Sequence, residues 1–178
     1  ALVVARRNGL PIPDVAGLAA VPLTVAYGIG RLGCLLSGDG TYGRPTDLPW
    51  GMSFPNGVVP TDVPVHPTPL YEALAAVVIA LLLTRFARHV RLPVVFAGYL
   101  VLSGAARFLV EYLRINDSTL LGMTQPQLWA LVSIAAGPAV MLRAARTDAR
   151  SRSRGDGPPA GAGGTVLDGT EAAVAGGR

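Results

Sequence analysis

The chain contains four long apolar windows, and each approaches the length that a helix needs to cross a membrane. A bilayer core about 30 Å thick requires roughly 20 apolar residues in a helix. The windows run from Asp14 to Ser37, from Leu70 to Ala87, from Pro93 to Leu113 and from Gln125 to Leu142. The mean hydropathy is +0.45 and only 15% of the residues are charged, which is too apolar for an ordinary soluble domain. We therefore predict an all-α fold, that of a polytopic integral membrane protein with about four full transmembrane helices.

The placement of the arginines predicts the orientation of these helices. All 15 basic residues are arginine, and they gather at the ends of the apolar windows rather than on one surface, which argues against nucleic-acid binding. Cytoplasmic loops carry excess positive charge. We therefore place Arg6–Arg7, Arg85–Arg91 and Arg143–Arg150 in the cytoplasm. The segments Gly38 to Pro69 and Ile115 to Thr124 then face outward.

The two ends of the chain differ from its middle. Residues 1–5 are apolar and would form the end of a preceding helix. The residues after Ala1 do not have the pattern of a signal peptide. We therefore expect a part of a longer protein. Residues 147–178 are rich in Gly, Ala, Ser and Arg. We predict a transmembrane domain over residues 1–146 and a disordered cytoplasmic tail over 147–178.

Two windows carry signals of a helix start. Thr124 and Gln127 have the spacing of a capping box before the fourth window. Thr68 and Pro69 precede the second window, where Glu72 is an acid favoured by the helix dipole. We therefore expect helices to begin at these points.

Ionisable residues inside apolar windows are costly and usually mark a function. Arg107, Glu111 and Arg114 are spaced i, i+4 and i+7, which places them within an arc of roughly 60° on one helix face. Arg31 lies in the outer half of another window, so these groups could meet. Two guanidinium groups with one carboxylate leave a positive charge that suits a phosphate. The alternative is an internal Arg107–Glu111 pair, with Arg114 and Arg31 extending to the interface.

Other candidates lie beside these windows. His66 places an imidazole before a helix start, where it could accept a proton from a thiol or alcohol, although a lone loop histidine often has no such role. Asp39 lies between glycines and is either a site acid or a turn former. Gly30 and Gly33 would allow close helix approach. The single cysteine, Cys34, excludes an internal disulfide.

Three segments in order resemble the motifs of a known family. They are Gly30-Arg31-Leu32-Gly33 with the following glycine, acid and Tyr-Gly-Arg-Pro; His66-Pro67-Thr68 with Leu70-Tyr71-Glu72; and Gly104 to Glu111 with Arg114. Together they resemble the phosphatidylglycerol:prolipoprotein diacylglyceryl transferase family. The resemblance extends from Arg6 to about Arg143.

The resemblance implies a transferase of lipoprotein biosynthesis in the bacterial plasma (inner) membrane. It would move the diacylglyceryl group of phosphatidylglycerol to the lipobox cysteine thiol of a prolipoprotein, forming a thioether and releasing glycerol phosphate. The partners implied are phosphatidylglycerol, the lipobox peptide and membrane lipid, with no cofactor and no metal. The acceptor cysteine belongs to the substrate, so Cys34 is not the nucleophile.

The resemblance also implies roles for individual residues. Arg31 would hold the headgroup, Arg107 would stabilise the departing phosphate, and Glu111 would orient this arginine pair. The implied catalytic set is Arg31, Arg107, Glu111, Asp39 and His66. The implied substrate-binding set is Arg31, Arg107, Arg114, Tyr71, Glu72 and Gly43.

Some positions depart from the family pattern. The family has asparagine in place of Cys34, glutamate in place of Asp39 and usually glutamine in place of Pro69, and its His-Gly-Gly motif would lie upstream of Ala1. These departures leave open a divergent, non-catalytic paralogue that binds phospholipid in the membrane. A transporter is a weaker alternative, because it would place charges near the bilayer midplane.

Overall fold

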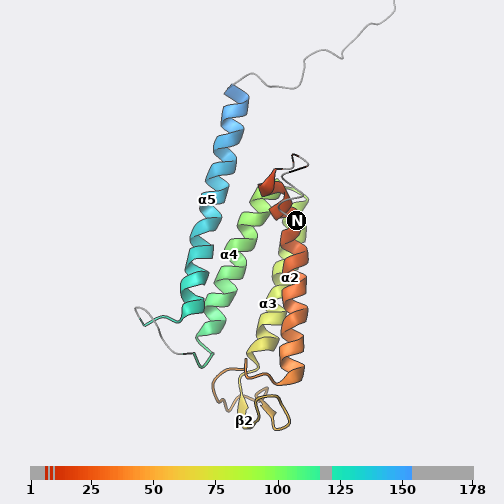
Figure 1. The fold of residues 1–178 in the computed structure, drawn as a ribbon, viewed down its shortest axis with the longest axis vertical. Coiled ribbons are helices and arrows are strands. Elements are labelled where there is room, and N and C mark those ends of the chain that lie inside the picture. Colours follow the sequence, from red (N-terminus) through yellow and green to blue (C-terminus); the bar gives the residue numbers. More distant parts are fainter. Residues whose placement is uncertain (1–6, 8, 10, 117–121, 154–178) are drawn as a thin grey trace, which may run out of the picture. The chain divides into compact units, whose positions relative to one another are not determined.

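The computed structural model describes residues 7, 9, 11–116 and 122–153. Its elements are, in order, α2 (Ile12–Ser37), β1 (Met52–Phe54), β2 (Thr61–Val65), α3 (Thr68–Ala87), α4 (Leu92–Glu111) and α5 (Gln125–Ser153) (Figure 1). All four helices are long and apolar enough to cross a membrane. The predicted all-α, multi-pass fold is thereby confirmed. The expected end of a preceding helix, at residues 1–5, lies outside the described residues.

Proline and glycine set several of the helix ends. Proline occupies one of the first two positions of α2, α3 and α4, where its missing N–H would have no helical partner. Helix α2 ends at Gly38, which adopts a left-handed conformation with φ 56°. At the start of α5, the backbone N–H of Thr124 donates to the side-chain oxygen of Gln127 at 3.0 Å. This contact is one half of the predicted capping box.

Thr68 connects the start of α3 to another segment. Thr68 is the first residue of α3 rather than the residue before it, and no side chain caps this helix. The Thr68 hydroxyl instead donates to the carbonyl oxygen of Thr41 at 2.7 Å. It therefore ties the start of α3 to the loop that follows α2.

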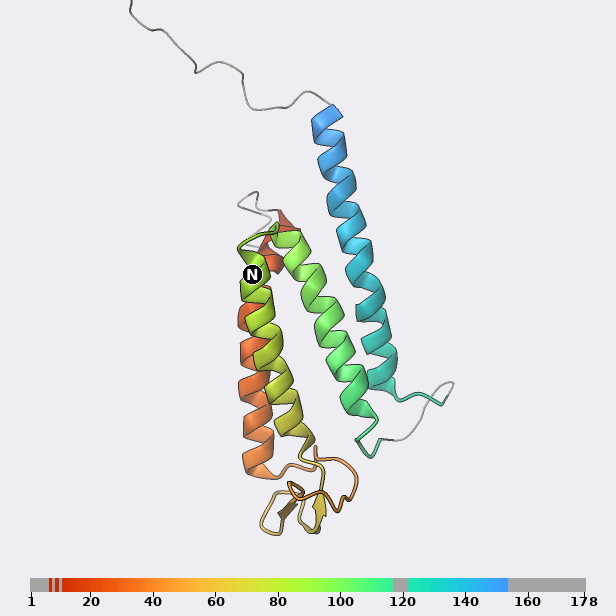
Figure 2. The same ribbon diagram turned by 180° about the vertical axis from the view of Figure 1, so that it is seen from behind.

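Small residues bring the helices close together. Helices α2, α3 and α4 pack against one another in pairs, around a core of Ala20, Ile79, Leu83 and Val95. At Gly104 of α4, an added Cβ would lie 2.9 Å from the carbonyl oxygen of Ala130 in α5. Figures 1 and 2 show α5 running beside α4 from the end that carries this contact. Backbone approach therefore depends on glycine here.

The predicted role of Gly30 and Gly33 is wrong for the described part of the chain. An added Cβ at either position meets nothing within 4 Å. Gly28, two residues earlier, faces α3 instead, and its Cβ would lie 3.0 Å from that of Ala76. The helix is turned so that the pair expected to pack points away from the described neighbours.

Large apolar side chains cover the outside of the helices. Leu18, Ile29, Leu81 and Leu109 are each more than 60% exposed. In water this surface would be costly, whereas lipid tails solvate it. The exposed apolar surface therefore agrees with four membrane spans.

The segment between α2 and α3 contains a small antiparallel hairpin, which was not expected. Strands β1 and β2 pair with an irregularity between Met52 and Phe54. They are three and five residues long, and Pro64 interrupts β2, so no alternating pattern marks them in the sequence. The backbone N–H of Arg44 donates to the carbonyl oxygen of Leu113 at 2.8 Å. The segment between α2 and α3 therefore meets the chain just after α4.

The described residues up to Ala145 belong to one compact unit, and those from Arg146 to Ser153 belong to a second. Helix α5 continues past residue 147, where the tail was expected to begin, and ends at Ser153. The rest of the expected tail, residues 154–178, lies outside the described residues. The boundary between a membrane domain and a disordered tail stays a prediction.

Candidate functional site

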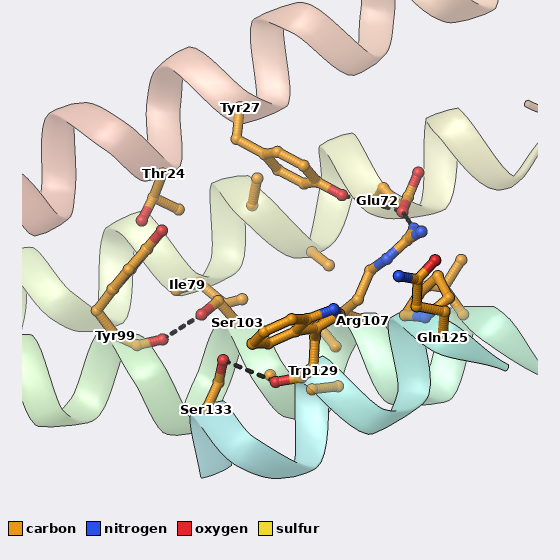
Figure 3. Close-up of a pocket in the computed structure, with 17 residues that line it drawn as sticks. Thr24, Tyr27, Glu72, Ile79, Tyr99, Ser103, Arg107, Gln125, Trp129 and Ser133 are labelled. Carbon is orange, nitrogen blue, oxygen red and sulfur yellow. Dashed lines mark hydrogen bonds and ion pairs between the residues drawn. The ribbon is translucent and has the colours of Figure 1, made fainter. Parts of the chain in front are cut away.

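A buried carboxylate, Glu72, links two intramembrane arginines. Glu72 lies in the first turns of α3, and its side chain is 2% exposed. The Nε of Arg31, from α2, lies 3.0 Å from its Oε2, and Nη1 of Arg107, from α4, donates to its Oε1. Figure 3 shows Arg107 pointing toward Glu72 from the neighbouring helix. The expectation that Arg31 and Arg107 meet is confirmed, and Glu72 is the group that joins them.

A second buried carboxylate, Glu111, continues the cluster. Its side chain is fully buried, and its Oε2 lies 3.4 Å from Nη2 of Arg107 and 3.9 Å from Nε of Arg114. Arg107 therefore bridges both carboxylates. Among the described residues, Glu111 contacts Arg107 and Arg114, whereas Glu72 bridges Arg31 and Arg107. The orienting role that the resemblance implied for Glu111 stays a prediction.

The cluster carries a net positive charge. Three arginines and two glutamates give 3 − 2 = +1, with the ion pairs linking them into one chain. The sequence predicted one carboxylate, Glu111, among the arginines. The second carboxylate, Glu72, reduces the excess positive charge without removing it. Buried charges persist only when they are paired. One further negative charge would balance this site.

Neutral donors bind one oxygen of each carboxylate, and these donors were missed from the sequence. The Tyr27 hydroxyl donates to Oε1 of Glu72 at 2.9 Å. The Thr124 hydroxyl donates to Oε1 of Glu111 at 2.8 Å, and the side-chain amide of Asn116 donates to the same oxygen. Tyr27 lies one helical turn before Arg31, which was a signal of a shared face. Thr124 had a sufficient local explanation as a cap.

Arg114 lies just after α4, at the end of the cluster. Burial lowers the pKa of its guanidinium, and the positive charge of Arg107 lowers it further. Its Nε and Nη1 are buried and have no hydrogen-bond partner in the described part of the chain. The Arg114 backbone pairs with Gly43, where an added Cβ would lie 2.9 Å from Thr68 and would overlap the carbonyl oxygen of Leu113. Gly43 thus allows three segments to meet, and its contact with substrate stays a prediction.

His66 and Tyr71 form a separate group on the loop side of α3. The Nδ1 of His66 lies 3.4 Å from the Tyr71 hydroxyl, which also accepts a hydrogen bond from Nε1 of Trp50 at 2.8 Å. Because Tyr71 precedes Glu72 in the helix, the two side chains point about 100° apart. Among the described residues, His66 therefore contacts Tyr71 and makes no contact with the glutamates or arginines of the cluster. Its role as a proton acceptor stays a prediction.

Asp39 organises the loop after α2. It accepts hydrogen bonds from the backbone N–H of Thr41 at 3.1 Å and from the Thr41 hydroxyl at 2.6 Å. Burial raises the pKa of the Asp39 carboxyl, but hydrogen bonds from Cys34 and Thr41 outweigh it and leave the pKa below its usual value. These contacts are those of a turn former. A catalytic role for Asp39 stays a prediction.

An apolar cavity of about 560 Å³ opens beside the cluster (Figure 3). Its polar lining includes Tyr27, Glu72 and Arg107, while Ile79 and Trp129 belong to its apolar lining. The volume lies within the range of small-molecule sites. Such a cavity can hold an amphipathic molecule with an anionic head beside the arginines.

Comparison with known proteins identifies the family of this chain. A family model described as prolipoprotein diacylglyceryl transferase matches residues 1–143. Similar relatives are named phosphatidylglycerol-prolipoprotein diacylglyceryl transferase. That of Geobacter sulfurreducens is 42% identical over 119 residues, which cover 66% of this chain and 44% of the relative. That of Azotobacter vinelandii is 35% identical over 153 residues, covering 82% of this chain and 57% of the relative.

A third relative extends the match along the chain. The protein of this name from Rhodococcus jostii is 32% identical over 185 aligned residues, covering 92% of this chain and 51% of the relative. The chain thus spans about half the length of the relatives it matches. Because the family match extends over most of its apolar helices and over the whole ion-pair cluster, the chain belongs to the prolipoprotein diacylglyceryl transferase family.

Proposed function

We propose that this chain carries the phosphatidylglycerol-binding part of a transferase that attaches a diacylglyceryl group to prolipoproteins. One observation carries the proposal. Two arginines from different membrane helices, Arg31 and Arg107, are held on one buried carboxylate beside an apolar cavity. The names of the relatives supply the substrates, phosphatidylglycerol and a prolipoprotein.

The chemistry of the cluster suits a phospholipid headgroup. Guanidinium groups bind phosphate through paired N–H donors, and the net charge of +1 requires an anion. The apolar lining of the cavity suits acyl chains, since lipid tails and side chains such as Ile79 and Trp129 are similarly apolar. A lipid with a singly charged phosphodiester would satisfy both parts of the site.

The proposed reaction forms one bond and breaks another. The thiol sulfur of the lipobox cysteine attacks the glyceryl carbon that bears the phosphate ester, and the thiol proton leaves with the released glycerol phosphate. The new C–S bond is a thioether, and the broken C–O bond releases glycerol phosphate. Negative charge develops on the departing phosphate, where Arg107 would stabilise it while Arg31 holds the headgroup. Charge that is already in place at that point lowers the barrier.

The glutamates have a supporting role in this proposal. Glu72 and Glu111 keep the arginines charged and fixed, so that little reorganisation is needed when the phosphate leaves. Arg114 would add positive charge at the same end of α4. Asp39, Gly43 and His66 lie in the adjoining loop and Tyr71 in the first turn of α3. We retain Asp39 and His66 as candidate catalytic residues, and Gly43 and Tyr71 as candidate substrate contacts.

We place this site at the outer face of the bacterial plasma membrane. Arg85, Arg88 and Arg91 lie at the α3–α4 connection, whereas the ion-pair cluster lies near the starts of α3 and α5. The positive-inside rule assigns the arginine-rich connection to the cytoplasm. The cluster then belongs to the outer half of the bilayer, where a translocated lipobox peptide would be exposed.

The test is thioether transfer in bacterial membranes that lack the host enzyme. The protein is expressed as its gene encodes it, with any segments that flank these 178 residues, and is given labelled phosphatidylglycerol and a lipobox peptide. We expect label on the peptide thiol. Arg31→Ala should abolish transfer and leave membrane insertion intact, because it removes a phosphate contact from an otherwise apolar helix.

Arg85→Ala is the matched control. Arg85 is an exposed arginine at the other end of α3, where it contacts His89, and its loss should leave transfer unchanged. Full transfer by Arg31→Ala would refute the assignment. Retention of labelled phosphatidylglycerol without any transfer by the unmodified protein would instead support the phospholipid-binding alternative.

A further inference from the structure

Tyr27 connects the cavity to Arg31. It lines the cavity together with Glu72 and Arg107, whereas Arg31 is not among the lining residues. Its hydroxyl donates to Oε1 of Glu72 at 2.9 Å and accepts a hydrogen bond from Nε of Arg31 at 3.1 Å. Figure 3 shows the Tyr27 ring directed toward Glu72 from α2. One phenol therefore contacts both members of an ion pair.

The hydrogen bond from Arg31 points to Tyr27 and not to Glu72. The Nε of Arg31 lies 3.0 Å from Oε2 of Glu72, yet that oxygen accepts no aligned hydrogen bond from any described residue. The guanidinium carbon also lies 5.0 Å from the centre of the Tyr27 ring, which is a cation–π distance. Tyr27 thus contacts the guanidinium of Arg31 in two ways: its hydroxyl accepts a hydrogen bond from Nε, and its ring lies against the guanidinium face.

This geometry prevents a bidentate ion pair between Arg31 and Glu72. A bidentate pair with a carboxylate uses two parallel N–H groups of an arginine, which are the same donors that a phosphate would take. In the structure, Nε is shared with Tyr27, and Nη1 has the Cys34 sulfur at 3.9 Å as a weak acceptor. Without the Tyr27 oxygen, Arg31 could rotate and close onto Glu72.

We propose that Tyr27 is a positioning residue that keeps Arg31 from forming a bidentate pair with Glu72 and thereby leaves the terminal N–H groups of Arg31 available for the phosphate of the lipid headgroup. The inference rests on the proposed function for the identity of the lipid. It assigns a role to a residue that lies outside the three motifs. The role is in headgroup affinity, so the loss should appear in KM and in lipid retention rather than in kcat.

The test compares Tyr27→Phe with the unmodified protein, in nanodiscs and as encoded by its gene. Phenylalanine keeps the ring against Arg31 and removes the oxygen alone. We expect the KM for phosphatidylglycerol to rise about tenfold, the size of one hydrogen bond to a charged group, with kcat changed by less than about twofold. Retention of labelled phosphatidylglycerol should weaken by a similar factor. Retention of diacylglycerol, which has no phosphate, should be unchanged.

Tyr112→Phe is the control, because Tyr112 is an exposed tyrosine at the end of α4 that lies outside the cavity lining. It should match the unmodified protein in both measurements. If Tyr27→Phe is not recovered folded, Tyr27→Trp tests the same contact, since its indole retains an aromatic face and offers no acceptor to Nε of Arg31. The same rise in KM is expected.

Three outcomes would overturn the inference. One is an unchanged KM and unchanged phosphatidylglycerol retention in Tyr27→Phe. Another is an equal loss of phosphatidylglycerol and diacylglycerol retention, which would indicate a damaged cavity. The third is a fall in kcat alone. If the unmodified protein retains phosphatidylglycerol but transfers nothing, the proposed function fails, while the retention assay still decides the role of Tyr27.

Discussion

Removal of the charge on Glu72 is the sharpest test of the ion-pair cluster. Glu72→Gln preserves the shape of the side chain and changes the net charge of the five ionisable groups from +1 to +2, since three arginines then face one glutamate. Breaking a buried ion pair by removing one partner costs about 3–5 kcal/mol. The side chains of Arg31 and Arg107 keep 18% and 26% exposure, and Arg107 keeps Glu111. We therefore expect a smaller loss, about 2–3 kcal/mol.

Thermal unfolding in mild detergent measures this loss. At about 2–4 °C per kcal/mol for a chain of this size, the midpoint should fall by roughly 4–12 °C. Phosphatidylglycerol should also raise the midpoint of Glu72→Gln more than that of the unmodified protein, because its phosphate supplies the missing negative charge. Asp62→Asn is the control, since Asp62 is an exposed acid on β2. A midpoint for Glu72→Gln equal to that of Asp62→Asn would refute the idea that Glu72 holds the arginines.

Two further variants test how the loop and α5 are joined to the site, with the same unfolding midpoint as the measurement. Gly43→Ala should destabilise the protein by about 1–3 kcal/mol through overpacking. The control Gly30→Ala should leave the stability unchanged, because its added Cβ meets nothing within 4 Å. Equal unfolding midpoints for the two variants would contradict the close approach at Gly43. Thr124→Val should cost about 1–2 kcal/mol by leaving Glu111 short of a donor. Thr84→Val, whose hydroxyl bonds only its own helix, should cost less, and an equal cost would refute the link to Glu111.

The helices could be predicted from the sequence because their signals are local. The first three apolar windows coincide closely with α2, α3 and α4, and the fourth matches the start of α5 but ends before the helix does. Proline or glycine marks several of the ends. The length of an apolar window and the backbone preferences of proline and glycine depend on one segment only. The helices can therefore be predicted without knowledge of the tertiary structure. Helix packing is different. The glycine spacing at Gly30 and Gly33 predicted a contact that the described structure lacks, while Gly104 of α4 makes one. Small-residue spacing identifies a possible contact face and says nothing about which way the helix is turned.

The site was predictable to the extent that it lies on one helix. Arg107 and Glu111 share a face of α4 because of helical spacing alone, Arg114 follows just after the helix, and the structure joins the three in that order. Glu72 and Tyr27 were harder to assign, because each of them joins the cluster only when α2, α3 and α4 pack together. Glu72 also had an adequate local explanation as an acid near a helix start, which concealed its tertiary role.

Charge balance is the signal by which the sequence alone could identify Glu72. Three arginines at one membrane depth cannot be sustained by one glutamate, because buried cations require partners. The second apolar window, Leu70 to Ala87, contains a single acid near its outer end, and that acid is Glu72. The same accounting does not find Tyr27 or Thr124, since neutral hydroxyls change no charge and occur commonly in helices and caps. In a membrane protein, the sequence can therefore reveal the ion pairs of a site through their charge, whereas the neutral donors that orient those pairs emerge only from the packed helices.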